Sequence, residues 1–388
     1  MTMRPSRVSL RPIHPERIVR APRACRVPHA RREAGAAIIS ALLIVTLCAV
    51  LVAGLLWRQQ VQIRRIENQR LLAQAQWVSR GALDWTRLIL RSEADTAPTV
   101  TYLGGVWAVP IAKTRLSDFL GKLGQADAQQ GAQTYLSGSI EDAQAKFNLR
   151  NLVNIPAPGA LQLSALQIAS FRRLLTSLGM DGSLAKNTAV QFRTALRQSA
   201  MRFQSPANSP LGAAPTPEQM AGAVVGNATD KAGLEDDSSG GNASLDNAPL
   251  QMTSVDALLN VDGFTPDMVA RLRPFVTVLP TQTPVNMNTA PAEVVAAMVP
   301  GMSLSSAQGF VARRESTFFR NTSDVQLALQ GAGALSPLID PSSMDVTTSY
   351  FLVHGHVQHE RAEVDRTTLI YRDPLTHTTR VVRVTDQP

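Results

Sequence analysis

Cysteine is almost absent from this chain, which has two among its 388 residues, Cys25 and Cys48, and none after position 48. Two thiols placed in this way exclude a disulfide framework and a cysteine-based metal site. The sequence also lacks a Gly-x-Ser-x-Gly motif, a P-loop and a dinucleotide-binding fingerprint. These absences point away from an enzyme, and from a fold held together by metal or disulfides.

Histidine is scarce as well. The segment HGHVQH predicts that His354 and His356 lie on one face of a strand, a pattern that raises the question of a metal site. No cysteine or carboxylate pattern accompanies them, so we interpret them as surface histidines of a strand and assign no metal ligand. The six histidines are His14, His29, His354, His356, His359 and His377.

Charge is distributed unevenly along the chain. The formal net charge is +8 and the pI about 10.1, a balance that would favour nucleic acid or an anionic membrane surface as a partner. Much of the excess lies in an arginine-rich leader before residue 34. Without that leader the chain is close to neutral, so the global pI says little about the folded part. The leader arginines are Arg4, Arg7, Arg11, Arg17, Arg20, Arg23, Arg26, Arg31 and Arg32.

A run without charged residues extends from Gly35 to Trp57. At about 1.5 Å per helical residue it is long enough to cross a hydrocarbon core of about 30 Å. By the positive-inside rule, the leader arginines would stay on the cytoplasmic side. The residues after Trp57 would then lie on the other side of the membrane. Helical periodicity then continues, with no proline before Pro98. We expect one helix of about 55 residues, half in a membrane and half packed on a domain.

The glycine at the border between the charged leader and the apolar run resembles the type IV pilin and pseudopilin class. The resemblance implies that a prepilin peptidase cuts after Gly35 and methylates the new terminal residue, Ala36. A residue without Cβ suits such a site, because a protease must approach an extended backbone closely. The alternative is a plain signal anchor whose glycine is incidental. Most members of the class carry glutamate at the fifth mature position, which is Ser40 here, and a serine suits a subunit with no neighbour above it.

Three further segments are informative: GSIEDAQAKFNLRNLV (138–153), PVNMNTAPAEVVAAMVPGM (284–302) and TSYFLVHGHV (348–357). Together with the first helix they resemble the general secretion pathway protein K family, the large minor pseudopilin of type II secretion. The resemblance implies an α+β, pilin-like fold with a long N-terminal transmembrane helix and an antiparallel sheet. A large α-helical insert domain interrupts that fold.

Local residue patterns predict several of the individual strands and helices. The first segment predicts an alternating strand through Phe147, ending in a turn where Asn148 and Asn151 satisfy local backbone groups. Ser164 and Gly179 are the expected cap residues of a helix between them, and a second helix is expected over 190–203. Helical patterning returns at Ser254 and again over 266–272, and the tail from Tyr350 predicts a strand followed by a hairpin.

The expected organisation has five parts. Within the insert, 205–247 is rich in Ser, Pro, Gly, Ala and Asn and is predicted to be a mobile loop, while 284–330 looks like a helix-hairpin-helix unit. The parts are a leader (1–35), the N-terminal helix (36–91, with 36–57 transmembrane), the first part of the pilin-like domain (92–153), the insert (154–345) and the C-terminal strands (346–388).

Two segments raise the question of DNA binding or calcium binding. A helix-hairpin-helix unit can hold DNA phosphates through backbone amides, but its usual second glycine is Ser303 here, and Arg313 and Arg314 are interpreted as a solvated helix face. DNA binding, as in a competence pseudopilin, is the alternative function, and nucleic acid is not the expected partner. Members of the family can also bind calcium. The acidic run Glu235–Asp237 is interpreted as solvated, and no cofactor or ligand is assigned.

The function implied by the resemblance is assembly rather than catalysis. Protein K would join the other minor pseudopilins, types I and J, at the tip of a periplasmic filament that moves folded proteins through the outer membrane. Further expected partners are the major pseudopilin, the inner-membrane assembly platform and the prepilin peptidase. The chain would be a single-pass inner-membrane protein with its C-terminal domain in the periplasm.

Overall fold

The computed structural model describes residues 34–122, 131–157, 160–204, 251–334 and 340–387. The chain divides into two units, residues 1–66 and 67–388. The arginine-rich leader before residue 34, the segment predicted as a mobile loop (205–247) and the acidic run within it lie outside the described residues.

The first helix, α1 (Ala34–Thr96), is 63 residues long. No proline interrupts it, and Pro98 follows two residues after its end, where the chain can no longer continue as a helix. The expected span of 36–91 is therefore extended at both ends. Among the described residues, α1 is the helix that is long and apolar enough to cross a membrane, with a mean hydropathy of 2.8 over its most apolar stretch, none of which is buried.

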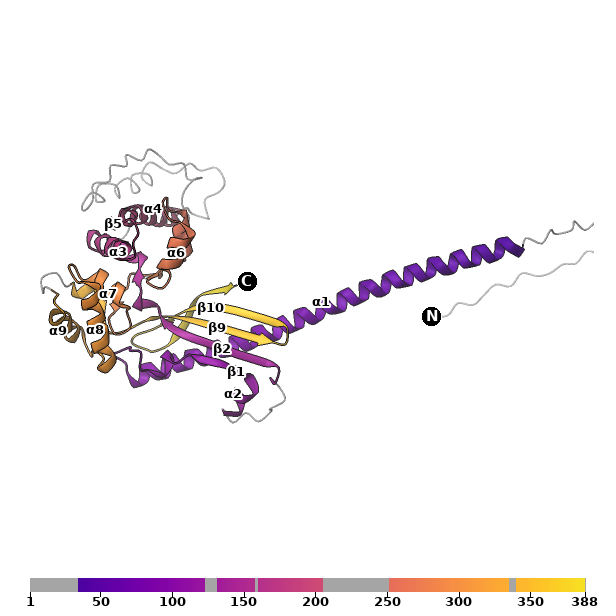
Figure 1. Cartoon of the computed structure of the whole chain (residues 1–388), viewed down its shortest axis with the longest axis horizontal. Coiled ribbons are helices and arrows are strands. Elements are labelled where there is room, and N and C mark those ends of the chain that lie inside the picture. The colour runs from indigo at the N-terminus through magenta and orange to yellow at the C-terminus, as the bar shows by residue number, and fades with distance from the viewer. Residues whose placement is uncertain (1–33, 123–130, 158–159, 205–250, 335–339, 388) are drawn as a thin grey trace, which may run out of the picture. The chain divides into compact units, whose positions relative to one another are not determined.

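A five-stranded antiparallel sheet forms the framework of the second unit (Figure 1). Its spatial order is β1-β2-β9-β10-β11, so that β2 and β9 are neighbours although residues 143–349 separate them in the sequence. The strands are β1 (Ile111–Arg115), β2 (Thr134–Asp142), β9 (Tyr350–His359), β10 (Ala362–Arg372) and β11 (Thr379–Gln387). The alternating tail pattern thus forms three strands joined by two hairpins, and the α+β class expected from the sequence is confirmed.

The C-terminal part of α1 packs along this sheet. Its buried positions recur at intervals of one or two helical turns, as in Ala75, Ser79, Thr86 and Leu90, so one stripe of the helix faces the strands. Leu90 lies in an apolar cluster with Trp107, Phe351, Val353 and Ile370. Ala75 belongs to a second cluster with Leu136, Val357 and Val364. Small residues at 75 and 79 let the helix approach the sheet closely.

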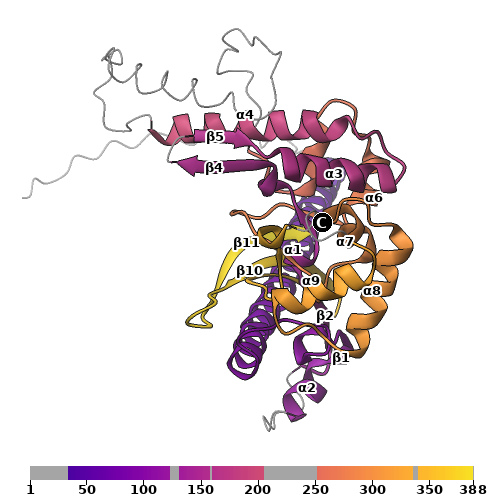
Figure 2. The ribbon, with the colours of Figure 1, turned by 90° about the vertical axis from the view of Figure 1, so that its left-hand side faces the viewer.

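The residues between β2 and β9 form a mainly helical region around its own large core, which contains Phe147, Phe171, Phe192 and Phe310. Figure 2 shows α3 and α4 as one group of helices, with the short strands β4 and β5 beside α4, and α8 and α9 as another. The helices are α3 (Ala165–Ser177), α4 (Leu184–Gln204), α6 (Pro266–Leu272), α7 (Ala292–Met298), α8 (Leu304–Ser316) and α9 (Thr322–Gly331). The short strands are β3 (Phe147–Asn148), β4 (Val153–Ala157), β5 (Ala160–Leu163), β6 (Val276–Thr277), β7 (Val285–Asn286) and β8 (Met344–Asp345).

The two ends of α3 lie at the predicted cap residues. The Ser164 hydroxyl accepts a hydrogen bond from the amide of Gln167, and Gly179 adopts the positive φ of 72° that ends many helices. The helix expected over 190–203 instead begins at Leu184, because Leu184 and Ala185 are buried in the insert core and the chain turns into the helix at Asp181. The patterning at Ser254 forms a 3-10 helix over Val255–Asn260, and α6 covers 266–272 as predicted.

The strand predicted through Phe147 is too long. β2 ends at Asp142, where the side chain of this residue accepts a hydrogen bond from the amide of Gln144 and starts a 3-10 turn over Ala143–Ala145. Phe147 is buried in the insert core, apart from the face that β2 presents to α1. A side-chain cap and a 3-10 turn over Ala143–Ala145 have therefore replaced part of the predicted strand, and the chain returns to strand only at β3.

Candidate functional site

The residues predicted for processing lie at the start of α1. Gly35 and Ala36 fall in its first turn, where the amide groups have no partner one turn before them in the helix. An extended scissile bond would thus require only the first turn to unwind, and glycine lowers the cost of unwinding because it is a poor helix former. Ser40 lies one turn further on and is exposed.

A second candidate site was not predicted from the sequence. The side chain of Asp142, at the end of β2, is fully surrounded by donors. Its Oδ1 accepts a hydrogen bond from the amide of Gln144 at 2.7 Å. Its Oδ2 accepts three more, from Nδ2 of Asn286 at 2.8 Å and from the hydroxyls of Thr289 and Thr348, each at 2.6 Å. We call Asp142 with these partners the Asp142 node.

The node extends through Asn286 to the sheet and to α1. Nδ2 of Asn286 also lies 3.0 Å from the carbonyl oxygen of Thr101, while the Thr101 hydroxyl accepts from the Thr348 amide and from Arg372. The guanidinium of Arg372 further donates to the carbonyl oxygens of Leu90 and Thr348 and stacks over Phe351. All these polar side chains are buried. One carboxylate thereby connects α1, two strands of the sheet and the helical insert.

The electrostatics of the node balance burial against hydrogen bonding. Burial raises the pKa of Asp142, and the four hydrogen bonds oppose that rise by favouring the carboxylate. Burial likewise lowers the pKa of Arg372, and Asp142 and Glu93 oppose that change. Four donors from the chain itself already satisfy the carboxylate, so we interpret the node as structural: it fixes the insert against the sheet.

A signal for this node was present in the sequence. Asp142 belongs to the segment 138–153, Asn286 and Thr289 belong to 284–302, and Thr348 opens 348–357. The three segments that carry the resemblance therefore meet at one carboxylate. Their small polar residues could have been interpreted together as one buried network instead of separately as turn residues.

The prediction that Asn148 and Asn151 bind local backbone groups in a turn is only partly right. Asn148 does accept a local bond from the amide of Arg150, but it also binds the amide of Leu279 and the carbonyl of Thr281. Asn151 exchanges two hydrogen bonds with the backbone of Thr283, at 2.7 and 3.1 Å. These buried amides hold together segments about 130 residues apart in sequence, so local turn chemistry explains only one of their bonds.

The paired histidines lie on the sheet as predicted. Nε2 of His354 lies 3.4 Å from a Glu141 oxygen, and Nδ1 of His356 lies 2.6 Å from an Asp365 oxygen, with both rings partly exposed. Burial would raise the pKa of Glu141, but hydrogen bonds from His354 and Lys146 bring it below its ordinary value. Within the described ranges, no group of three or more His, Cys, Asp or Glu is placed to hold a metal ion.

The helix-hairpin-helix-like segment contains α7 and α8, joined by a turn in which Gly301 has a φ of 77°. Ser303 caps α8 by accepting a bond from the amide of Ser306. Arg313 is exposed, but Arg314 is buried and donates to the carbonyl of Met287 at 2.8 Å. Burial lowers the pKa of Arg314 to about 10. The prediction of a solvated arginine pair is wrong for Arg314, which packing of α8 turns into the core.

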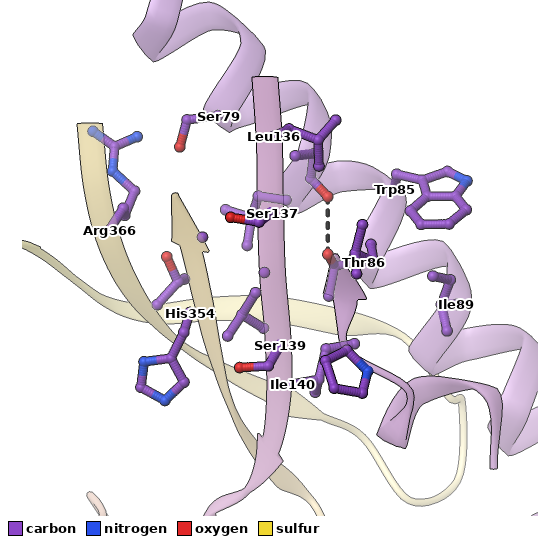
Figure 3. A pocket seen from close by; sticks show the side chains of 18 of the residues that line it. Ser79, Trp85, Thr86, Ile89, Leu136, Ser137, Ser139, Ile140, His354 and Arg366 are labelled. Atoms are coloured by element: carbon purple, nitrogen blue, oxygen red, sulfur yellow. Dashed lines mark hydrogen bonds between the residues drawn. The ribbon is translucent and has the colours of Figure 1, made fainter. Parts of the chain in front are cut away.

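A cavity of about 230 Å³ lies between α1 and the sheet. Figure 3 shows Trp85, Thr86 and Ile89 approaching it from α1, and Leu136 and Ile140 from β2. His354 and Arg366 are the titratable residues of its lining, and Arg366 is already paired with Asp386. The lining is otherwise apolar or hydroxylic. Gly138 and Gly355 face each other across β2 and β9 and both line the cavity.

These two glycines should respond differently to alanine. A Cβ at Gly138 would lie 2.7 Å from the carbonyl oxygen of His354, whereas at Gly355 the nearest atom, the carbonyl oxygen of Arg366, is 3.9 Å away. We expect Gly138→Ala to lower the free energy of unfolding by about 1 to 3 kcal/mol, as overpacking does. Gly355→Ala should be neutral or slightly stabilising, because alanine suits a strand interior better than glycine. Denaturant unfolding of both variants measures this, and equal losses would contradict the geometry.

The sequence of this chain matches models and members of a known protein family. A family model described as type II secretion system protein K matches residues 285–342, and a second with the same description matches 145–281, so that together they cover just over half of the chain. The type II secretion system protein K of Pseudomonas aeruginosa is 27% identical over 337 residues, which are 84% of this chain and 85% of that protein. The protein K of Aeromonas hydrophila is 25% identical over 340 residues, covering 84% and 88%.

A solved structure has the same fold. One chain of the crystal structure of the GspK-GspI-GspJ complex, from the type 2 secretion system of enterotoxigenic Escherichia coli, superposes with a TM-score of 0.53 at 17% identity. The superposition covers 84% of this chain and 99% of that chain. With its apolar first helix, interrupted antiparallel sheet and matching family models, the chain belongs to the type II secretion system protein K family.

Proposed function

We propose that this chain is the minor pseudopilin at the tip of the type II secretion pseudopilus, where it initiates assembly and helps folded proteins cross the outer membrane. The observation that carries the proposal is α1, which is apolar and exposed in its first part and packed on the pilin-like sheet in its last part. Such a helix can serve both as a membrane anchor and as the stem of a folded domain.

The proposed topology follows from the helix and its flanks. The leader would stay in the cytoplasm, the apolar stretch would cross the inner membrane once, and the domain would lie in the periplasm. A prepilin peptidase would cut after Gly35, and Ala36 would become the methylated amino terminus. The assembly platform and the major pseudopilin would be the partners of the apolar stretch.

A structural role fits the polar groups of the second unit better than catalysis does. The Asp142 carboxylate accepts four hydrogen bonds, all from this chain, and the cavity beside α1 is mostly apolar. Burial of Arg314 also removes one of the two arginines on which the alternative of DNA binding depended. We therefore infer a subunit that acts through contacts with other proteins.

The other minor pseudopilins, types I and J, are the proposed partners at the tip. The support is the complex in which the related chain of Escherichia coli was crystallised with GspI and GspJ. The test is to extract the full chain in mild detergent together with its own I and J subunits. We expect the three to purify as one complex, and a chain that purifies alone under these conditions would contradict the proposed tip function.

Ser40 provides a test of position in the filament. An isolated charge in the hydrocarbon layer costs about 2.5 to 3.5 kcal/mol, so a glutamate there needs a partner such as the amino terminus of a neighbouring subunit. We expect Ser40→Glu to be processed normally but to impair tip assembly, or to let the chain enter the filament body. The control is Ser40→Ala, which stays small and neutral. Normal secretion and normal binding of I and J by the Ser40→Glu variant would show that Ser40 does not set the tip position.

A further inference from the structure

Three arginines follow the apolar stretch of α1 without any acid between them. Arg58 comes directly after Trp57, and Arg64 and Arg65 follow within two helical turns. All three are exposed, and none has an ion-pair partner in the part of the chain that the structure describes. Exposed, unpaired positive charges at the end of a membrane helix are attracted to anionic groups at the membrane surface.

We propose that Arg58, Arg64 and Arg65 bind the phosphates of anionic phospholipid headgroups on the side of the membrane where α1 emerges. This site rests on the proposed membrane anchor, and it adds a lipid class as a ligand of that anchor.

The long arginine side chains allow the three guanidinium groups to reach one headgroup layer, although their Cα atoms lie at different depths. Arg58 and Arg65 are seven residues apart, so they lie about 20° apart around the helix and about 10 Å apart along it, and Arg64 widens the arc to about 120°. The headgroup layer is about 5 to 8 Å thick on each side. Side chains of a helix lean toward its N-terminus, which here is toward the membrane, so the long stems of Arg64 and Arg65 reach back into that layer.

Neighbouring residues favour lipid over a protein surface. Trp57 is 71% exposed at the end of the apolar stretch, where tryptophan is enriched at membrane interfaces. The first acid after the arginines is Glu67, and its carboxylate is paired with Arg361 at 3.4 Å. The negative charge that would most strongly repel anionic lipid is therefore already paired with a cation of the folded domain. An acidic helix of another subunit is the competing ligand, and one outcome of the test below would identify it.

The experiment uses the full chain in nanodiscs made of phosphatidylcholine with one-fifth phosphatidylglycerol. The lipids that remain bound after gentle delipidation are counted by mass spectrometry. We compare the wild type with Arg58→Gln/Arg64→Gln/Arg65→Gln. The matched control is Arg80→Gln/Arg91→Gln/Arg320→Gln, which removes the same charge at exposed positions further from the apolar stretch.

We expect phosphatidylglycerol to be enriched on the wild type and on the control. The enrichment should fall at least about fivefold in the first variant, which is the change expected from the loss of even one arginine at the surface. Equal enrichment on all three proteins, or an equal loss in the control, would overturn the proposal. The same variants are also tested for co-purification with the I and J subunits in mild detergent. Full lipid enrichment on the first variant together with lost co-purification of I and J would assign the arginines to an acidic protein surface instead.

The same experiment separates this site from the anchor. A chain that does not enter nanodiscs would overturn both the membrane anchor and the lipid site. A chain that enters them but retains phosphatidylglycerol only in proportion to its bulk fraction would overturn the lipid site alone.

Discussion

Asp142→Ala is expected to lower the free energy of unfolding of the second unit by about 3 to 5 kcal/mol, the loss found when one member of a buried charged network is removed. The variant leaves the amide groups of Gln144 and Asn286 and two threonine hydroxyls without their acceptor. It also leaves Arg372 buried near a site that has lost its charge. Urea unfolding followed by circular dichroism measures the change.

The adjacent residue supplies the control. Glu141 stands one position earlier on the opposite face of β2 and is paired with Lys146 at 2.7 Å, but its side chain is 38% exposed. Glu141→Ala removes the same charge and should cost no more than about 1 kcal/mol, as partly exposed ion pairs do. If both variants lose the same stability, the connections through Asp142 contribute nothing beyond charge, and the node does not fix the insert against the sheet.

Gly35→Leu is expected to abolish processing by prepilin peptidase, so that the precursor accumulates at full mass. The proposed scissile bond follows Gly35 in the first turn of α1, and a branched side chain there both obstructs an extended backbone in the protease and makes the turn more helical. The measurement is the mass of the amino terminus in cells with and without the peptidase.

Gly54→Leu is the matched control for processing. Gly54 lies within the same apolar stretch, and a Cβ there would meet nothing within 4 Å, so the substitution adds the same side chain without a clash. This variant should be cut as efficiently as the wild type. Normal cleavage of Gly35→Leu would show that processing does not depend on Gly35 and would contradict the proposed prepilin peptidase site.

The sequence was most informative where one local rule decides the structure. Uninterrupted helical periodicity up to Pro98 predicted α1, and cap chemistry at Ser164 and Gly179 predicted α3. The alternation after Tyr350 predicted the C-terminal strands, although consecutive residues such as Tyr350 and Phe351 are both buried because the sheet is covered on both faces there. In these elements local propensity and tertiary packing agree.

Long-range polar contacts could not be predicted in this way. Small polar residues such as Asn151 and Asn286 look alike whether they close a turn or bind a segment 130 residues away, because their side chains suit both uses. The burial of Arg314 could not be predicted either, because two adjacent arginines on a helix do not indicate which of them faces the core. The Asp142 node was not predicted from the sequence, because its members come together only when β2 pairs with β9.

The separation of β2 from β9 also has a consequence for how the chain folds. Until residue 359 has reached the folding compartment, β2 can pair only with β1, and its other edge has no partner in the sheet. Neighbouring helices between them, such as α7 and α8, can pack earlier, because closing a short loop costs less entropy than closing one of about 200 residues. Sheet closure, satisfaction of Asp142 and docking of the insert would then be one late cooperative step. A chain shortened before Tyr350 would present an unpaired edge strand, which is the surface through which incomplete β-proteins aggregate.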